Sequence, residues 1–240
     1  MFDLKTCIKV LPLSLIFVGM ITFNNICLNF VTVSFYNVAR SLSIVFNVVF
    51  TYLILRKSTS LLTCSTLLIV CFGFYVGIEG EVEFSLIGTV TGVVASMFVS
   101  LNSILTSWTL PHVSGDKNLL LFYNNFNASV LFAPLLILVE RDIIIENIYK
   151  FSFISFWVTM LITGVMGFCT GLVTVMQVKA TSPLTHNISG TAKAAVQSLL
   201  AFYIWNNKAT FQGITGLFTV LIGSALYAYV VALPKSDTKN

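Results

Sequence analysis

The sequence predicts an all-α protein that crosses a membrane about eight times, and three observations predict this fold class. Of the 240 residues, 57% are hydrophobic and only 9% are charged, whereas soluble domains carry about 25% charge. The mean hydropathy is +0.93. Apolar segments of about 17–25 residues recur along the chain, and each is long enough to cross a hydrocarbon core about 30 Å thick. Because no soluble remainder follows it, the first segment is not expected to be a cleaved signal peptide.

Short polar connections set the limits of the spans. We expect helices at residues 10–30, 34–55, 59–78, 84–108, 118–139, 152–175, 183–205 and 210–232. The longest connection runs through Glu140–Lys150, and none is long enough to form a separate domain. Glycines four residues apart, which favour close helix approach in lipid, are Gly73/Gly77, Gly88/Gly92 and Gly167/Gly171. The cysteines have no metal-site or disulfide spacing, so no metal or other cofactor is expected.

Basic residues in the connections predict how the chain is oriented in the membrane. One side collects eight of them: Lys5, Lys9, Arg56, Lys57, Lys117, Lys179, Lys235 and Lys239. The other side has three, which are Arg141, Lys150 and Lys208, together with the acidic stretch EGEVE at 79–83. Because Lys and Arg concentrate in cytoplasmic loops, we expect both termini in the cytosol.

A shift of 150 residues relates two parts of the chain. Residues 35–59 then align with residues 185–209. The aligned polar pairs are Asn37 with Asn187, Ser41 with Thr191, and Asn47 with Gln197. The second and seventh helices therefore look like counterparts, as do the first and sixth, and the third and eighth.

The helix count then predicts the organisation of the chain. Five helices form the second unit and three precede it, so we expect an incomplete first repeat at 1–80, a second repeat at 81–233 and a cytosolic tail at 234–240. A five-helix repeat reverses its orientation in the membrane because five is odd, which is typical of inverted-repeat transporters. The partners of the fourth and fifth helices are then expected to be missing from the amino terminus.

Two cations, Arg40 and Lys193, lie well inside predicted spans, whereas all nine acidic residues lie in loops, tails or helix ends. A cation within a membrane costs about 2.5–3.5 kcal/mol on insertion scales, so it is functional by default. The alternative is that each cation satisfies backbone carbonyls at a helix break. We favour an anion site in a water-filled cavity, with Lys193 as a point charge and Arg40 as a bidentate fork.

Polar residues near these cations extend the candidate site. The stretch SGTAK, Ser189 to Lys193, offers hydroxyls, a glycine and the N–H groups of a helix start, which attract phosphate. In the fifth helix, the stretch FYNNFN places the carboxamides of Asn124 and Asn125 side by side. Carboxamides both donate and accept hydrogen bonds, which suits them to reading a nucleobase edge. The alternative for these asparagines is hydrogen bonding between helices.

Other functions fit the sequence poorly. The chain has no GxxxxGK[ST] loop to hold ATP, so an ATP-driven pump is excluded. Proton or sodium coupling usually needs intramembrane Asp or Glu, and none is expected here. An enzyme is not expected, because no nucleophile–base pair or metal set is visible. Exchange of one anion for another remains.

Four stretches resemble the nucleotide-sugar transporters of the drug/metabolite transporter superfamily, and the resemblance covers almost the whole chain. They are FYNVARSL, SLNSILT, LLFYNNFNASVLF and SPLTHNISGTAKA, of which the last is the most specific. The resemblance implies a ten-helix inverted-repeat fold from which this chain lacks the first two helices. It also implies exchange of cytosolic GDP-fucose for lumenal GMP across the Golgi membrane, which would supply fucosyltransferases.

The resemblance also assigns roles to residues. In related GDP-sugar carriers the FYNN asparagines read guanine, which implies this role for Asn124 and Asn125 beside Tyr123. The motif of the seventh helix contacts ribose and phosphate, which implies this role for Thr185, Ser189, Gly190, Thr191 and Lys193. Arg40, with Tyr36 in the same motif, lies where phosphate-translocating relatives keep a cation.

Several alternatives stay open. The substrate could be another GDP-sugar such as GDP-mannose, because no single residue type distinguishes fucose from mannose. The chain could also be a truncated form that transports nothing and acts only through partners, and a homodimer is an open alternative. Since each half of an inverted repeat contributes wall to the cavity, we expect the 240-residue form alone to be unstable or inactive.

Overall fold

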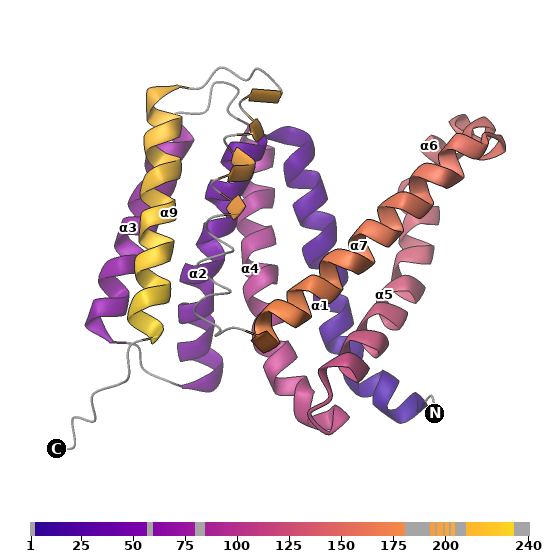
Figure 1. The fold of residues 1–240 in the computed structure, drawn as a ribbon, viewed down its shortest axis with the longest axis horizontal. Coiled ribbons are helices and arrows are strands. Elements are labelled where there is room, and N and C mark those ends of the chain that lie inside the picture. Colours follow the sequence, from indigo (N-terminus) through magenta and orange to yellow (C-terminus); the bar gives the residue numbers. More distant parts are fainter. Residues whose placement is uncertain are drawn as a thin grey trace. The chain divides into compact units, whose positions relative to one another are not determined.

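The computed structural model describes residues 3–56, 60–79, 85–180, 193–194, 196–198, 200–201, 203–204 and 210–232. Its helices are α1 (Leu4–Phe30), α2 (Val33–Leu55), α3 (Leu61–Glu79), α4 (Leu86–Thr109), α5 (Lys117–Val139), α6 (Arg141–Glu146), α7 (Ile154–Ala180) and α9 (Phe211–Ala232), with short 3-10 helices η1 (Leu110–Val113) and η2 (Ile148–Ser152) (Figure 1). Six helices of the described chain are long and apolar enough to cross a membrane, and α7 holds a shorter apolar stretch, Ile154–Thr170.

Seven of the eight predicted helices correspond to α1, α2, α3, α4, α5, α7 and α9. The all-α polytopic fold class is therefore confirmed. Most of the predicted helix at 183–205 lies outside the described residues, but those described between 193 and 204 are helical. We call these helical residues the Lys193 segment.

The largest error in a helix boundary lies at the start of α1, which begins at Leu4 rather than at residue 10. Asp3 caps this helix, because its carboxylate accepts hydrogen bonds from the backbone N–H groups of Lys5 and Thr6 at 3.1 and 3.2 Å. Side chains of this kind satisfy N–H groups that have no partner within the helix. Hydropathy misses the first turn because Lys5 and Lys9 make it polar.

The structure divides into two compact units, Met1–Ala128 with Asn187–Asn240, and Ser129–His186. We call them unit 1 and unit 2. In unit 1, α2 is the most enclosed helix, because it contacts α1, α3, α4 and α9 and six consecutive residues, 34–39, are buried. The predicted division into repeats, 1–80 and 81–233, rests on similarity in sequence rather than on contacts between residues, and it stays a prediction.

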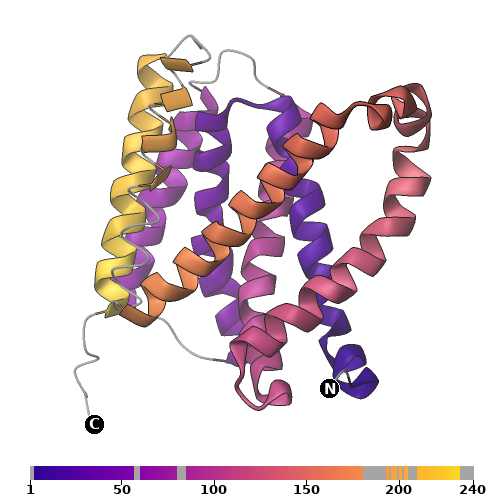
Figure 2. The same cartoon turned by 45° about the vertical axis from the view of Figure 1, so that its right-hand side comes forward.

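Within unit 1, α3 and α9 lie side by side and run antiparallel (Figure 2). A methyl group on Gly73 would lie 2.8 Å from the backbone nitrogen of Val220, and one on Gly223 would lie 3.2 Å from that of Val70. These two contacts are related by a shift of 150 residues, which is the shift seen in the sequence. The hydrogen bonds at the helix starts follow the same shift: the Ser60 hydroxyl accepts from the N–H of Thr63, and the Thr210 hydroxyl accepts from the N–H of Gly213.

The glycine pairs behave differently from one another. Gly77 and Gly92 are sites of close approach, since a methyl group on Gly77 would lie 2.9 Å from Val38 and one on Gly92 would lie 3.1 Å from Ala39. Gly167 has no such neighbour in the described part of the chain within 4 Å. The packing predicted for the Gly167/Gly171 pair is therefore not seen at Gly167.

Unit 2 contains the rest of α5, together with α6, η2 and α7. The connection Glu140–Lys150 is more structured than expected, because it holds α6 and most of η2. Two side chains of η2, Tyr149 and Phe151, make ring contacts with α7 and the residue before it. Aromatic residues in a short connection can order it through such contacts.

Candidate functional site

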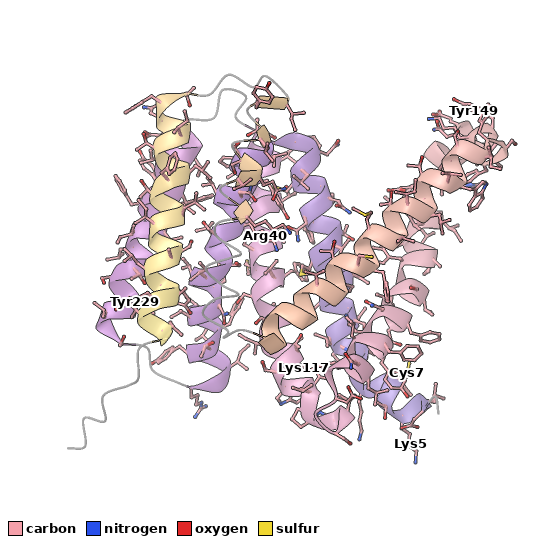
Figure 3. The ribbon with its side chains drawn as sticks, in the orientation of Figure 1. Lys5, Cys7, Arg40, Lys117, Tyr149 and Tyr229 are labelled. Atoms are coloured by element: carbon pink, nitrogen blue, oxygen red, sulfur yellow. The ribbon has the colours of Figure 1, made fainter. Side chains whose placement is uncertain are left out.

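Arg40 lies on α2, in the eighth position of the helix, and its side chain is exposed at the end of the buried stretch 34–39 (Figure 3). Arg40 thus lies inside the helix as predicted, and its depth in a membrane stays a prediction. The Arg40 side chain is exposed, which suits a group that is to meet a ligand. The acidic residues of the described chain stay at or near helix ends, so α2 carries no carboxylate of its own.

A hydrogen-bonded contact joins α2 to the Lys193 segment. The side-chain nitrogen of Asn37 donates to the hydroxyl of Ser198 at 2.9 Å and lies 3.5 Å from the carbonyl oxygen of Ala194. Asn37 and Ser198 are both buried. Asn37 is one helical turn before Arg40, and Ala194 follows Lys193 directly. The contact thus brings the two predicted cations onto neighbouring turns of touching helices.

Lys193 is helical and exposed. The remaining predicted residues of its motif, Thr185, Ser189, Gly190 and Thr191, lie outside the described residues. Their predicted contacts with phosphate and ribose therefore stay predictions. Lys193 is therefore an exposed helical residue directly before the contact of Asn37 with Ala194.

Tyr36 is buried in the interface between α1 and α2. Its hydroxyl donates to the side-chain oxygen of Asn24 at 3.0 Å, and the side-chain nitrogen of Asn24 donates to the carbonyl of Met20 at 2.7 Å. Tyr36 is one turn before Arg40 on α2. Its phenol is therefore held in place by α1, close along the helix to the predicted anion site.

The FYNN stretch of α5 is divided between two environments. Tyr123 and Asn124 are buried, whereas Asn125 is exposed. The hydroxyl of Tyr123 accepts from the backbone N–H of Asp3 at 2.8 Å, and the side-chain oxygen of Asn124 lies 3.0 Å from the hydroxyl of Ser14. Successive helix residues point about 100° apart, at 3.6 residues per turn. The two carboxamides therefore do not face one side of the helix.

Asn124 contacts α1 at the hydroxyl of Ser14, which can donate only one hydrogen bond. Ser14 lies 3.0 Å from the side chain of Asn124 and 3.3 Å from the carbonyl of Val10. If the proton goes to Val10, Asn124 satisfies Ser14 by presenting its nitrogen, because the two ends of a carboxamide exchange by a flip. Asn124 is therefore a contact between helices, as the alternative interpretation of the sequence expected.

Asn127 extends this contact between α1 and α5. Its side-chain nitrogen donates to the carbonyl of Cys7 at 2.9 Å, and the Cys7 thiol donates to its side-chain oxygen at 2.8 Å. Both ends of the carboxamide are thus engaged in a buried site. Sequence reasoning missed Cys7, Ser14 and Ser198 as polar partners, because small residues inside spans carry no signal of their own.

Comparison with known proteins gives a consistent result over most of the chain. Residues 1–228 match the triose-phosphate transporter family. The chain is 47% identical to GDP-fucose transporter 1 of Mus musculus over 234 residues, which is 95% of this chain and 64% of that protein. It is 41% identical to the Golgi GDP-fucose transporter of Drosophila melanogaster, over 96% of this chain and 69% of that one. It is 30% identical to a probable sugar phosphate/phosphate translocator of Arabidopsis thaliana, over 92% and 72%.

Proposed function

The chain belongs to the triose-phosphate transporter family, and from this premise we propose that it imports GDP-fucose into the Golgi lumen in exchange for GMP, with both termini in the cytosol. The family is one of transporters rather than enzymes. The substrate follows from relatives named as GDP-fucose transporters. The chain spans 64% of the length of the first of these, so the activity of the whole relative is carried over as a proposal.

The contact between Asn37 and Ser198 carries the proposal on the structural side. It joins the helices of Arg40 and Lys193, and both side chains are exposed beside it. Two cations held this way match a diphosphate, which has about two negative charges at neutral pH. GMP has about −1.5 to −2 charges under the same conditions. One site can therefore accept either anion with little change in net charge, as an exchanger requires.

Each cation would contribute different chemistry. The Arg40 guanidinium presents parallel N–H donors that suit two phosphate oxygens at once, and the Lys193 ammonium acts as a compact charge on a flexible stem. Tyr36, one turn from Arg40, has its phenol oxygen directed to Asn24. We assign Tyr36 to the wall of the site rather than to direct phosphate binding.

Recognition of guanine is assigned to Asn125, with Asn124 as a supporting residue. Asn125 is exposed, whereas Asn124 is buried against Ser14. A carboxamide that presents both a donor and an acceptor can bond the edge of a base. Thr185, Ser189, Gly190 and Thr191 complete the proposed site as contacts to ribose and phosphate.

Exchange in proteoliposomes tests the proposal. The purified chain is reconstituted in vesicles with or without GMP inside, and uptake of labelled GDP-fucose, GDP-mannose and a UDP-sugar is measured. We expect GDP-fucose to be taken up fastest and only when GMP is inside. Faster uptake of GDP-mannose would show that mannose, not fucose, is the preferred sugar. Uptake of GDP-fucose into empty vesicles at the same rate as into vesicles with GMP would contradict exchange.

A further inference from the structure

Five aromatic side chains between the end of α5 and the start of α7 form one ring pair and one group of three contacting rings. They are Tyr149, Phe151, Phe153, Phe156 and Trp157. Four of their ring pairs have centroids 5.0–6.3 Å apart, and three of these pairs meet edge to face. Aromatic rings prefer such geometry. We call these five residues the aromatic cluster.

The aromatic cluster is ordered but not covered within unit 2. Trp157 donates its indole N–H to the carbonyl of Phe151 at 2.8 Å, so its polar group is satisfied inside the cluster. Tyr149, Phe153 and Trp157 are nevertheless 56–57% exposed. The neighbouring aliphatic side chains of Ile148 and Ile154 are 63% and 81% exposed. Unit 2 therefore leaves several large apolar side chains of this short stretch exposed.

The charges around the aromatic cluster do not favour an anionic partner. Residues 140–150 contain two basic and three acidic side chains, which are Arg141, Lys150, Glu140, Asp142 and Glu146. Their sum is −1. The Lys150 ammonium lies 6.0 Å from the centre of the Tyr149 ring, within the range of a cation–π contact. Attraction to anionic lipid needs clustered basic residues without matching acids.

We propose that the aromatic cluster lies in the headgroup–acyl boundary of the bilayer and anchors the connection between α5 and α7 to the membrane surface. It binds lipid through apolar and aromatic contact rather than through charge. Aromatic residues with one apolar and one polar end concentrate at this depth. The segment is therefore a membrane-bound element and not a loop that projects into water.

The position of the aromatic cluster along the chain selects lipid as its partner. Tyr149 is five residues before Ile154, where the apolar helix α7 begins. At about 2 Å per residue in a 3-10 helix, five residues rise only about 10 Å. The interfacial layer on each side of the hydrocarbon core is about 5–8 Å thick. The aromatic cluster therefore stays at or near this layer, and lipid is the nearest apolar phase.

Depth-dependent quenching of Trp157 tests this inference without any transport assay. The chain has three tryptophans, so Trp108→Phe with Trp205→Phe leaves Trp157 as the single reporter. The full chain is reconstituted in phosphatidylcholine vesicles that contain lipids brominated at different acyl positions. We expect the strongest quenching by bromines near the headgroup, weak quenching by aqueous iodide, and no change when salt rises from about 0.1 M to about 1 M.

Two variants sharpen the result. Tyr149→Ser with Phe153→Ser removes two exposed rings that pair with each other, and leaves the rings that pair with Trp157. We expect this change to raise iodide quenching about twofold as the segment loosens from the surface. Phe72→Ser, an exposed aromatic residue on α3, is the matched control and should leave Trp157 unchanged.

Three outcomes would overturn the inference. Strong iodide quenching with no bromolipid quenching would show a loop in water. Strongest quenching by bromines at the bilayer centre would show a buried segment. Bromolipid quenching that weakens as the protein-to-lipid ratio rises would show that a second copy of the chain, rather than lipid, covers the aromatic cluster.

Discussion

The contact between α3 and α9 and the contact between α2 and the Lys193 segment both lie in unit 1. The first is made by small and apolar residues, and the second by buried polar groups. Along α3 and α9, glycines let the two backbones approach, and the surrounding buried side chains include Val38, Leu217 and Val220. Between α2 and the Lys193 segment, a buried carboxamide bonds a hydroxyl and approaches a carbonyl.

The difference shows two roles of helix contacts in a bilayer: close packing, and fixing one arrangement of two helices. Small residues pack helices closely in lipid without polar groups, so the pair α3 and α9 acts as a scaffold. A buried carboxamide must keep its partners or lose about 1–3 kcal/mol for each group left unsatisfied. It therefore fixes one arrangement of two helices, and the helices fixed by Asn37 are those with Arg40 and Lys193.

The largest expected effect comes from breaking the scaffold. A methyl group on Gly216 would lie 2.5 Å from the backbone nitrogen of Gly77, so Gly216→Leu should prevent folding. Overpacking typically costs about 1–3 kcal/mol, and here the obstacle is backbone that cannot move aside. The monodisperse yield in size-exclusion chromatography measures the loss. Gly167→Leu, which meets open space within unit 2, is the matched control and should keep its yield.

Lys193→Ala tests the other region by removing charge without removing packing. Exchange of GDP-fucose for GMP should fall at least about tenfold, which corresponds to 1.4 kcal/mol, while the melting temperature stays unchanged because the side chain is exposed. Arg40→Ala should act in the same direction. Lys117→Ala, an exposed cation at the start of α5, is the control. Normal uptake by Lys193→Ala would end its assignment to the anion site.

Asn37→Ala should lower both stability and uptake, because it leaves the buried Ser198 hydroxyl without its donor. The expected loss in free energy of unfolding is about 1–3 kcal/mol. A double-mutant cycle with Ser198→Ala isolates the pair, and coupling of about 0.5–3 kcal/mol is expected for residues in contact. Additive losses would show that the two side chains do not act together.

The two asparagines of FYNN should separate in a competition experiment. Asn125→Ala should weaken inhibition by GMP by about 1–3 kcal/mol relative to AMP and UMP, as expected for loss of a base contact. Asn124→Ala should instead lower the melting temperature, because its bond to Ser14 is worth about 0.5–1.5 kcal/mol. If Asn125→Ala weakened all three nucleotides equally, it would have no role in reading the base.

The smallest expected effect concerns Asp3 and depends on pH. The Thr6 hydroxyl and the N–H of Lys5 hold the pKa of the Asp3 carboxyl below its ordinary value of 3.8. A pKa depressed by folding gives stability that is present above the ordinary pKa and is lost as pH falls through the folded one. Asp3→Asn keeps a capping side chain but should remove this part of the acid sensitivity. Melting temperatures measured from pH 7 down to about 3 check the difference.

The features that depend on periodicity and length were predictable from the sequence. Hydropathy located seven helices, most of their ends to within a few residues. The contacts of Gly73 and Gly223 are related by the 150-residue shift seen in the sequence, but the shift did not predict that these helices touch. The start of α1 was missed because a cap at Asp3 extends the helix through a polar turn. The order of η2 was missed because it comes from ring contacts that leave no periodic pattern.

The residues of the candidate site stay predictions, and the sequence showed only part of their geometry. The position of Arg40 inside its helix and the chemistry of FYNN were visible in the sequence. Which asparagine turns inward was not, because this depends on where α1 crosses α5 and places Ser14 opposite Asn124. Ser198 was equally invisible as the partner of Asn37, since one buried serine in an apolar helix resembles any other.

The paired contacts of α3 and α9 have a consequence for how the sequence can change over time. Where Gly73 faces Val220 and Gly223 faces Val70, the space is shared between one small and one branched residue. A larger residue on either helix can be accepted only if the residue opposite becomes smaller. The corresponding pair of positions 150 residues away has the same limit on the combined size of its two residues. Over time, substitutions at this interface are therefore expected to keep the combined volume of two facing residues constant, while either residue can change.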